Sequence, residues 1–99
     1  MQQPYEISAV TGLVEAKGIT RSVLAYPNPA TDFLTLEVKE FDLSNLRFQL
    51  YDVQGNLLQS EKITGNQTSI MMRNLLPATY YLKVTESNKE VKVFKIIKN

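Results

Sequence analysis

The 99-residue sequence contains neither cysteine nor histidine. Without cysteine, the chain can form no disulfide and no thiolate zinc site, and cysteine usage does not mark its redox compartment. Without histidine, it lacks the usual general base near neutral pH and the commonest protein ligand for metals. We therefore expect no catalytic residues, no metal site and no cofactor, and we predict that the protein is not an enzyme.

Excess charge and long apolar runs are also missing. Eleven Lys and Arg residues face ten Asp and Glu residues, and the resulting net charge of +1 gives no bias toward nucleic acid or an anionic membrane. No stretch approaches the roughly 20 apolar residues of a membrane-spanning helix, and the first residues lack the basic start and apolar run of a signal peptide. A chain of this length builds one domain around one core. We predict no nucleic-acid partner and no transmembrane segment.

The most distinctive stretch is a corner with two prolines, Tyr26-Pro27-Asn28-Pro29. Proline has no N–H, and it restricts the residue before it to extended geometry, so both Tyr26 and Asn28 are expected to be extended. The corner is therefore stiff and joins a predicted strand at residues 22–26 to a second at 32–39. Residues 1–22 are mostly polar or small, and we interpret them as a linker with at most one short strand.

Alternation of apolar and polar residues predicts the strands. It is clearest at Leu34, Leu36 and Val38, which alternate with polar residues as in a half-buried strand. Further strands are predicted at residues 46–51, 56–63, 67–73, 80–85 and 90–97, with a type I turn at 52–55 and a tight turn at 87–88. About seven short strands without a helical period are typical of an all-β, immunoglobulin-like antiparallel β-sandwich, with a small barrel as the alternative.

The last predicted strand has an irregular pattern and many lysines. Val91 and Val93 share one face opposite Lys92, and a bulge near Val93 would reconcile them with the apolar residues that follow. Its lysines either deter pairing at an exposed sheet edge or form a basic edge that a receptor reads, including by strand addition. Both interpretations are compatible with the sequence.

Two other groups of residues are candidate sites. The acidic residues between positions 32 and 42 match no calcium-loop spacing, and solvated acids on strands and turns explain them. Tyr51 and Tyr81 are both predicted to point outward, which fits a sugar-binding platform or ordinary cross-strand packing.

Four separated pieces of the chain, taken together, resemble a known family. They are the corner with Ala30, the segment Leu50-Tyr51-Asp52-Val53-Gln54-Gly55, the run Tyr80-Tyr81-Leu82-Lys83-Val84 after Asn74-Leu75, and the final Phe94-Lys95-Ile96-Ile97-Lys98-Asn99. In order and spacing, residues 23–99 resemble the type A C-terminal sorting domain of type IX secretion cargo, the Por secretion system sorting domain. The resemblance implies an immunoglobulin-like sandwich that serves as an address and not as a catalyst.

The resemblance also implies partners and a route. The family's cargo comes from Gram-negative bacteria, passes through the periplasm and crosses the outer membrane through the type IX translocon to the cell surface or the extracellular space. Outer-membrane sortase components commonly remove the domain from the N-terminal cargo domains of the parent protein, and we expect that cleavage upstream of Val23. The alternatives are an adhesive or carbohydrate-binding sandwich module of a secreted enzyme, and a purely structural spacer.

The resemblance assigns sorting-motif residues by position. The first motif supplies Pro27, Asn28 and Pro29, the middle one Tyr51, Asp52 and Gly55, and the last Tyr80, Lys83, Lys95, Ile96, Ile97 and Lys98. Ala78 stands where the family usually has glycine, so either the local turn differs here or the position needs no left-handed backbone. We expect replacement of the two corner prolines to reduce stability mainly, and truncation of the last strand's tip to abolish sorting of a domain that still folds.

Overall fold

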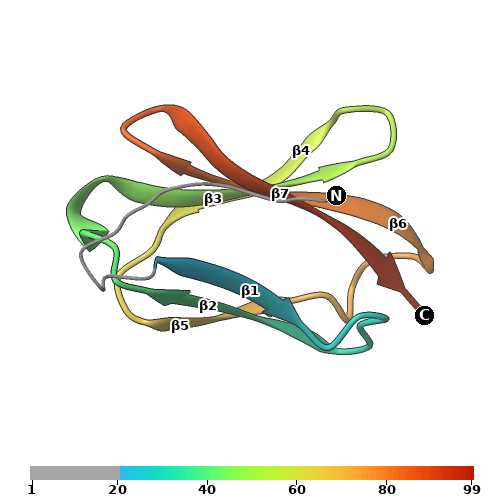
Figure 1. Ribbon diagram of the computed structural model, residues 1–99. Helices are drawn as coiled ribbons and strands as arrows, with labels where there is room; N and C mark the ends of the chain where they lie inside the picture. Colours follow the sequence, from blue (N-terminus) through green and yellow to red (C-terminus); the bar gives the residue numbers. More distant parts are fainter. Residues whose placement is uncertain (1–20) are drawn as a thin grey trace, which may run out of the picture.

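The computed structural model describes residues 21–99, which form two facing antiparallel sheets (Figure 1). One sheet has three strands in the order β1-β2-β5, and the other has four in the order β4-β3-β6-β7. The strands are β1 (Ser22–Tyr26), β2 (Phe33–Lys39), β3 (Leu46–Asp52), β4 (Leu57–Lys62), β5 (Gln67–Met71), β6 (Ala78–Glu86) and β7 (Lys89–Lys98). The predicted seven-stranded antiparallel sandwich is confirmed. The segment predicted as a linker lies outside the described residues, except for its last two positions.

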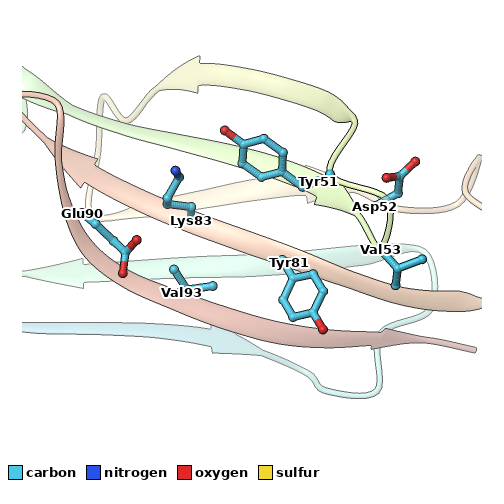
Figure 2. Close-up of a pocket in the computed structure, with 8 residues that line it drawn as sticks. Tyr51, Asp52, Val53, Tyr81, Lys83, Glu90 and Val93 are labelled. Carbon is cyan, nitrogen blue, oxygen red and sulfur yellow. The ribbon is translucent and has the colours of Figure 1, made fainter.

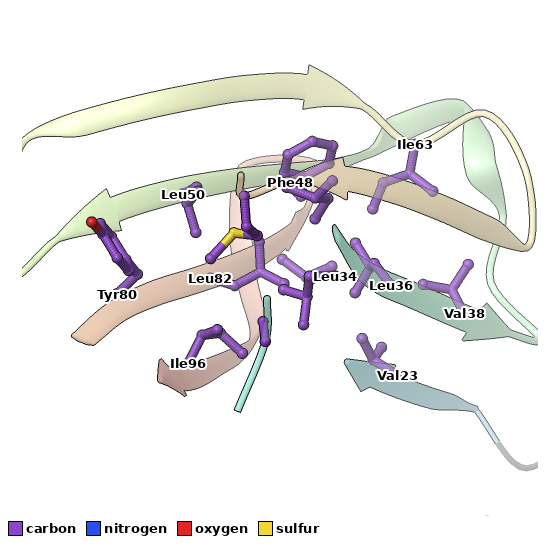
Figure 3. Packing of buried hydrophobic residues seen from close by; sticks show 14 of the residues in the cluster. Val23, Leu34, Leu36, Val38, Phe48, Leu50, Ile63, Tyr80, Leu82 and Ile96 are labelled. Carbon is purple, nitrogen blue, oxygen red and sulfur yellow. The ribbon is translucent and has the colours of Figure 1, made fainter. Parts of the chain in front are cut away.

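The core lies between the two sheets and is built from the inward-facing positions of the strands (Figure 3). In β2, the predicted alternation holds, because Leu34, Leu36 and Val38 are buried. Phe48 and Leu82 face them from the four-stranded sheet and are also fully buried. Among residues 21–99, no polar or charged side chain is buried. Apolar burial between two sheets is therefore the main favourable contribution to this fold.

The bulge in β7 differs from the prediction. Val84 pairs with Lys92 and Thr85 pairs with Glu90, so the predicted bulge is present but lies at Val91, two residues before Val93. An extra residue moves the following side chains to the other face of the sheet. Val91 consequently packs against the core, whereas Val93 points away from it and is 43% exposed.

The two predicted turns are present. In the first, the Gly55 N–H donates to the Asp52 carbonyl at 3.1 Å, and Gly55 has a φ of 87°, which glycine adopts without strain. In the second, Ser87 and Asn88 both have positive φ, as in the two-residue hairpin turns that match strand twist. Ala78 is the first residue of β6, pairs with Lys98 and is not left-handed, so this position needs no glycine.

Candidate functional site

The proline corner is hydrogen-bonded to the end of β7. The Asn28 side chain donates from Nδ2 to the Lys95 carbonyl at 2.9 Å, and its Oδ1 accepts from the Ile97 N–H at 2.9 Å. One amide group therefore forms the donor and acceptor pair that a neighbouring strand would supply to this edge. The corner lies between β1 and β2 of the three-stranded sheet, so the bonds join the two sheets.

Ala30 extends the same contact by two backbone bonds. Its N–H donates to the Ile97 carbonyl at 2.7 Å, and its carbonyl accepts from the Asn99 N–H at 3.0 Å. Ala30 is fully buried and forms a parallel bridge with Lys98. Pro27 and Pro29 are exposed, and both of their preceding peptide bonds are cis. We call these contacts between residues 28–30 and 95–99 the corner junction.

The corner junction holds the backbone at the end of β7, and some of the β7 side chains there remain exposed to solvent. Lys95 and Ile97 point to the outer face of the four-stranded sheet, where both are exposed. Ile96, between them, points into the core and is fully buried, and Lys98 is half-buried. The final segment thus combines a core anchor with two outward-facing side chains.

A shallow hollow lies on the outer face of the same sheet (Figure 2). It has a volume of about 390 Å³ and is lined by residues of β3, β6, β7 and the β3–β4 turn, namely Tyr51, Asp52, Val53, Gly55, Tyr81, Lys83, Glu90 and Val93. Tyr51 and Tyr81 are directly paired across β3 and β6, and the Lys83 Nζ lies 5.4 Å from the Tyr51 ring centroid. At this distance the ammonium group attracts the ring face.

Asp52 and Gly55 contribute to the hollow by building the turn at its end. The Asp52 Oδ1 accepts from the N–H groups of Gln54 and Asn56, both at 2.9 Å, and its Oδ2 accepts from the Asn56 side chain at 3.0 Å. The hydrogen bonds from Asn56 are the main reason why the pKa of the Asp52 carboxyl is lowered. Because this carboxylate is occupied by its own turn, its role in the described structure is to shape the backbone.

The domain that carries the corner junction and the hollow is similar to a known protein family. A family model for secretion system C-terminal sorting domains matches residues 24–99. The chain belongs to this family. Its members carry the C-terminal sorting signal for type IX secretion, and this is the function of the domain. No curated protein matches the chain.

Membership in this family sets the domain's partners and destination. A sorting domain interacts with the type IX secretion machinery and is attached to a parent protein, which it directs to the cell surface or the extracellular space. The sorting-domain family is not an enzyme family. Within residues 21–99, no helix is long and apolar enough to cross a membrane, and no group of three acidic side chains is placed to hold a metal ion.

The residues that the resemblance assigns to sorting motifs lie in three different environments of the structure. At the corner junction, Asn28 bonds to Lys95 and Ile97, which follow it in the sequence by 67 and 69 residues. Tyr51, Asp52, Gly55 and Lys83 come together around the hollow. Tyr80 is separate from both, because it is buried and its hydroxyl donates to the Leu76 carbonyl at 2.7 Å. Tyr80 and Ile96 thus stabilise the fold.

Two residues outside the motif assignment belong to these places. Ala30 supplies half of the corner junction, and Tyr81 supplies the second ring of the hollow. Alternation along β6 predicts that Tyr81 points outward, and the sequence had on that ground suggested it with Tyr51 as a candidate platform. Ala30 gives no comparable signal, since its role depends on backbone atoms.

Proposed function

We propose that the type IX translocon reads the outward side chains of the β7 tip while the corner junction keeps that tip in place. The observation that carries the proposal is the paired hydrogen bonding of Asn28 to Lys95 and Ile97. Fixing the backbone in advance lowers the ordering cost that a flexible tail would incur on binding. Lys95 and Ile97 then form a preorganised basic and apolar pair for the translocon.

The same proposal assigns the steps around recognition. The domain passes through the periplasm as part of its parent protein, and an outer-membrane sortase cuts the chain upstream of Val23 after export. The family membership supports this order of events, and the start of β1 at Ser22 supports a cut before the folded sandwich. The residues before β1 then act as the linker between cargo and sorting domain.

The deciding experiment fuses residues 1–99 to a periplasmic reporter in a type IX-competent strain. We expect export of the intact fusion and loss of export in a Lys95→Gln, Ile97→Thr double variant, because both changes affect exposed side chains. A Lys39→Gln, Leu24→Thr double variant is the matched control, since it makes the same kinds of change on the exposed surface of the other sheet. Retention of the intact fusion in the periplasm, while known cargo is exported, would refute the proposal.

Deletion of residues 95–99 is a poor test of recognition. It would remove Ile96 from the core together with all four bonds of the corner junction. We therefore expect the tip-truncated domain to be destabilised. The test uses point variants that leave the core intact. Both variants must keep the unfolding midpoint of the intact chain for their export to be compared.

A carbohydrate-binding module is the second candidate, and one observation favours it. Tyr51 and Tyr81 lie side by side on an open face, as a sugar platform requires, with Tyr81 38% exposed. The position of the Lys83 ammonium over the Tyr51 ring argues against it, because a stacked sugar would compete for that ring face. Binding to a glycan array that disappears in Tyr81→Thr would support this candidate.

A further inference from the structure

The outer face of the four-stranded sheet carries an apolar patch that the core does not use. Val53, Leu57, Tyr81, Val93 and Ile97 are between 37% and 63% exposed. Register places Tyr81 between Tyr51 and Lys95, and Lys83 beside Val93, so the patch is continuous across β3, β6 and β7. Contiguous exposed apolar residues with a charged rim are typical of protein interaction surfaces.

The outer face of the four-stranded sheet is positive overall, because register places Arg47, Lys62, Lys83 and Lys95 on it against Asp52 and Glu90. Lys83 and Lys95 flank the tyrosines, and within residues 21–99 neither lysine forms a salt bridge. Asp52 keeps its negative charge while it accepts hydrogen bonds from its own turn, and Glu90 is the second acidic side chain at the hollow. This excess of basic side chains beside exposed apolar residues favours a partner with carboxylates around an apolar centre.

We propose that this face docks onto a protein surface of the type IX machinery that has an apolar centre and an acidic rim. The proposal rests on the sorting function proposed above and names the surface and the chemistry of its partner. Tyr81 enters the apolar centre, and Lys83 pairs with a carboxylate of the partner. Tyrosine anchors surrounded by polar residues dominate the binding energy of many protein interfaces.

Reporter export tests the proposal with variants that reverse the charge of single side chains on this face. Fusions of residues 1–99 carry Lys83→Glu, Glu90→Lys, Tyr81→Thr or the control Lys39→Glu, which makes the same charge change on the other sheet. We expect the export rate to fall about tenfold in Lys83→Glu and in Tyr81→Thr, and to rise above that of the unaltered chain in Glu90→Lys. Lys39→Glu should match the unaltered chain.

Failure of this inference differs from failure of the proposed function. If the unaltered fusion is exported and Lys95→Gln, Ile97→Thr blocks it, while Lys83→Glu and Tyr81→Thr are exported normally, the docking face is wrong and the sorting function stands. Equal losses in Lys83→Glu and Glu90→Lys would also overturn the acidic partner. Co-sedimentation of the purified chain with phosphatidylglycerol vesicles, lost in Lys83→Glu, would assign the face to a lipid surface and overturn a protein partner. Unfolding midpoints within a few degrees of the unaltered chain separate all these outcomes from misfolding.

Discussion

Replacement of Asn28 by alanine should loosen the end of β7 without unfolding the sandwich. The substitution removes two hydrogen bonds of 2.9 Å, one to the Lys95 carbonyl and one from the Ile97 N–H. A neutral hydrogen bond contributes about 0.5–1.5 kcal/mol net, so the pair contributes about 1–3 kcal/mol. Because Asn28 is exposed and water can replace part of the loss, we expect the lower end, about 1–1.5 kcal/mol.

Amide hydrogen exchange measured by NMR at Ile97 is the direct assay. A loss of about 1.4 kcal/mol corresponds to roughly tenfold more frequent opening of the tip, and the exchange rate of the Ile97 amide should rise by that factor. Amides that exchange through local openings elsewhere in the domain should not change, since those openings leave the Asn28 bonds intact. Urea unfolding of the same protein should show a free energy of unfolding lowered by about the same amount.

Two further variants show whether the effect comes from the paired bonds. Asn28→Asp keeps an acceptor for the Ile97 N–H, but its second carboxylate oxygen faces and repels the Lys95 carbonyl oxygen, so the Ile97 exchange rate should exceed that of the unaltered chain. Asn74→Ala is the control, because the Asn74 side chain hydrogen-bonds to the Met71 sulfur, at 3.7 Å, and not to β7. An Ile97 exchange rate unchanged in Asn28→Ala would refute the role given to the corner junction.

Three further predictions concern acid stability, a buried hydroxyl and the core anchor. The folded-state pKa of Asp52 is lowered, so its contribution to stability is present above its ordinary pKa of 3.8 and is lost as pH falls through the folded value; Asp52→Asn should flatten the fall of the urea midpoint below about pH 4. Tyr80→Phe removes the bond to the Leu76 carbonyl and should lower the free energy of unfolding by about 1 kcal/mol in urea titrations, with unchanged export. Ile96→Ala should cost about 2–5 kcal/mol in the same titrations, whereas Ile97→Ala should cost less than about 1 kcal/mol; similar losses in both would contradict the inward and outward assignment.

Local pattern was sufficient to predict the strands of this domain. Leu34, Leu36 and Val38 alternate because one face of β2 is buried, and the hydropathy of a half-buried strand records that directly. Asp52 and Gly55 marked their turn in the same way, since both residue types favour its local geometry. Features encoded within a few neighbouring residues were therefore accessible from sequence.

Features that depend on pairing between distant segments were not accessible. The bulge at Val91 is defined by the register of β7 against β6, and a pattern read along one strand misplaced it by two residues. The bonds of Asn28 join positions 67 and 69 residues apart, and an exposed asparagine beside prolines is equally consistent with an ordinary turn. The convergence of Tyr51 and Lys83 at the hollow likewise required the register between β3 and β6.

The corner junction can form only late in the synthesis and folding of the domain. Its two halves are contributed by opposite ends of the domain, so the junction forms only after the last residues have been synthesised and both sheets have assembled. A chain that stops before Lys95, or one whose sheets are not yet joined, cannot display the tip in this arrangement. If the translocon reads the β7 tip as proposed, recognition of the domain also requires that its folding is finished, and a misfolded domain would not be exported.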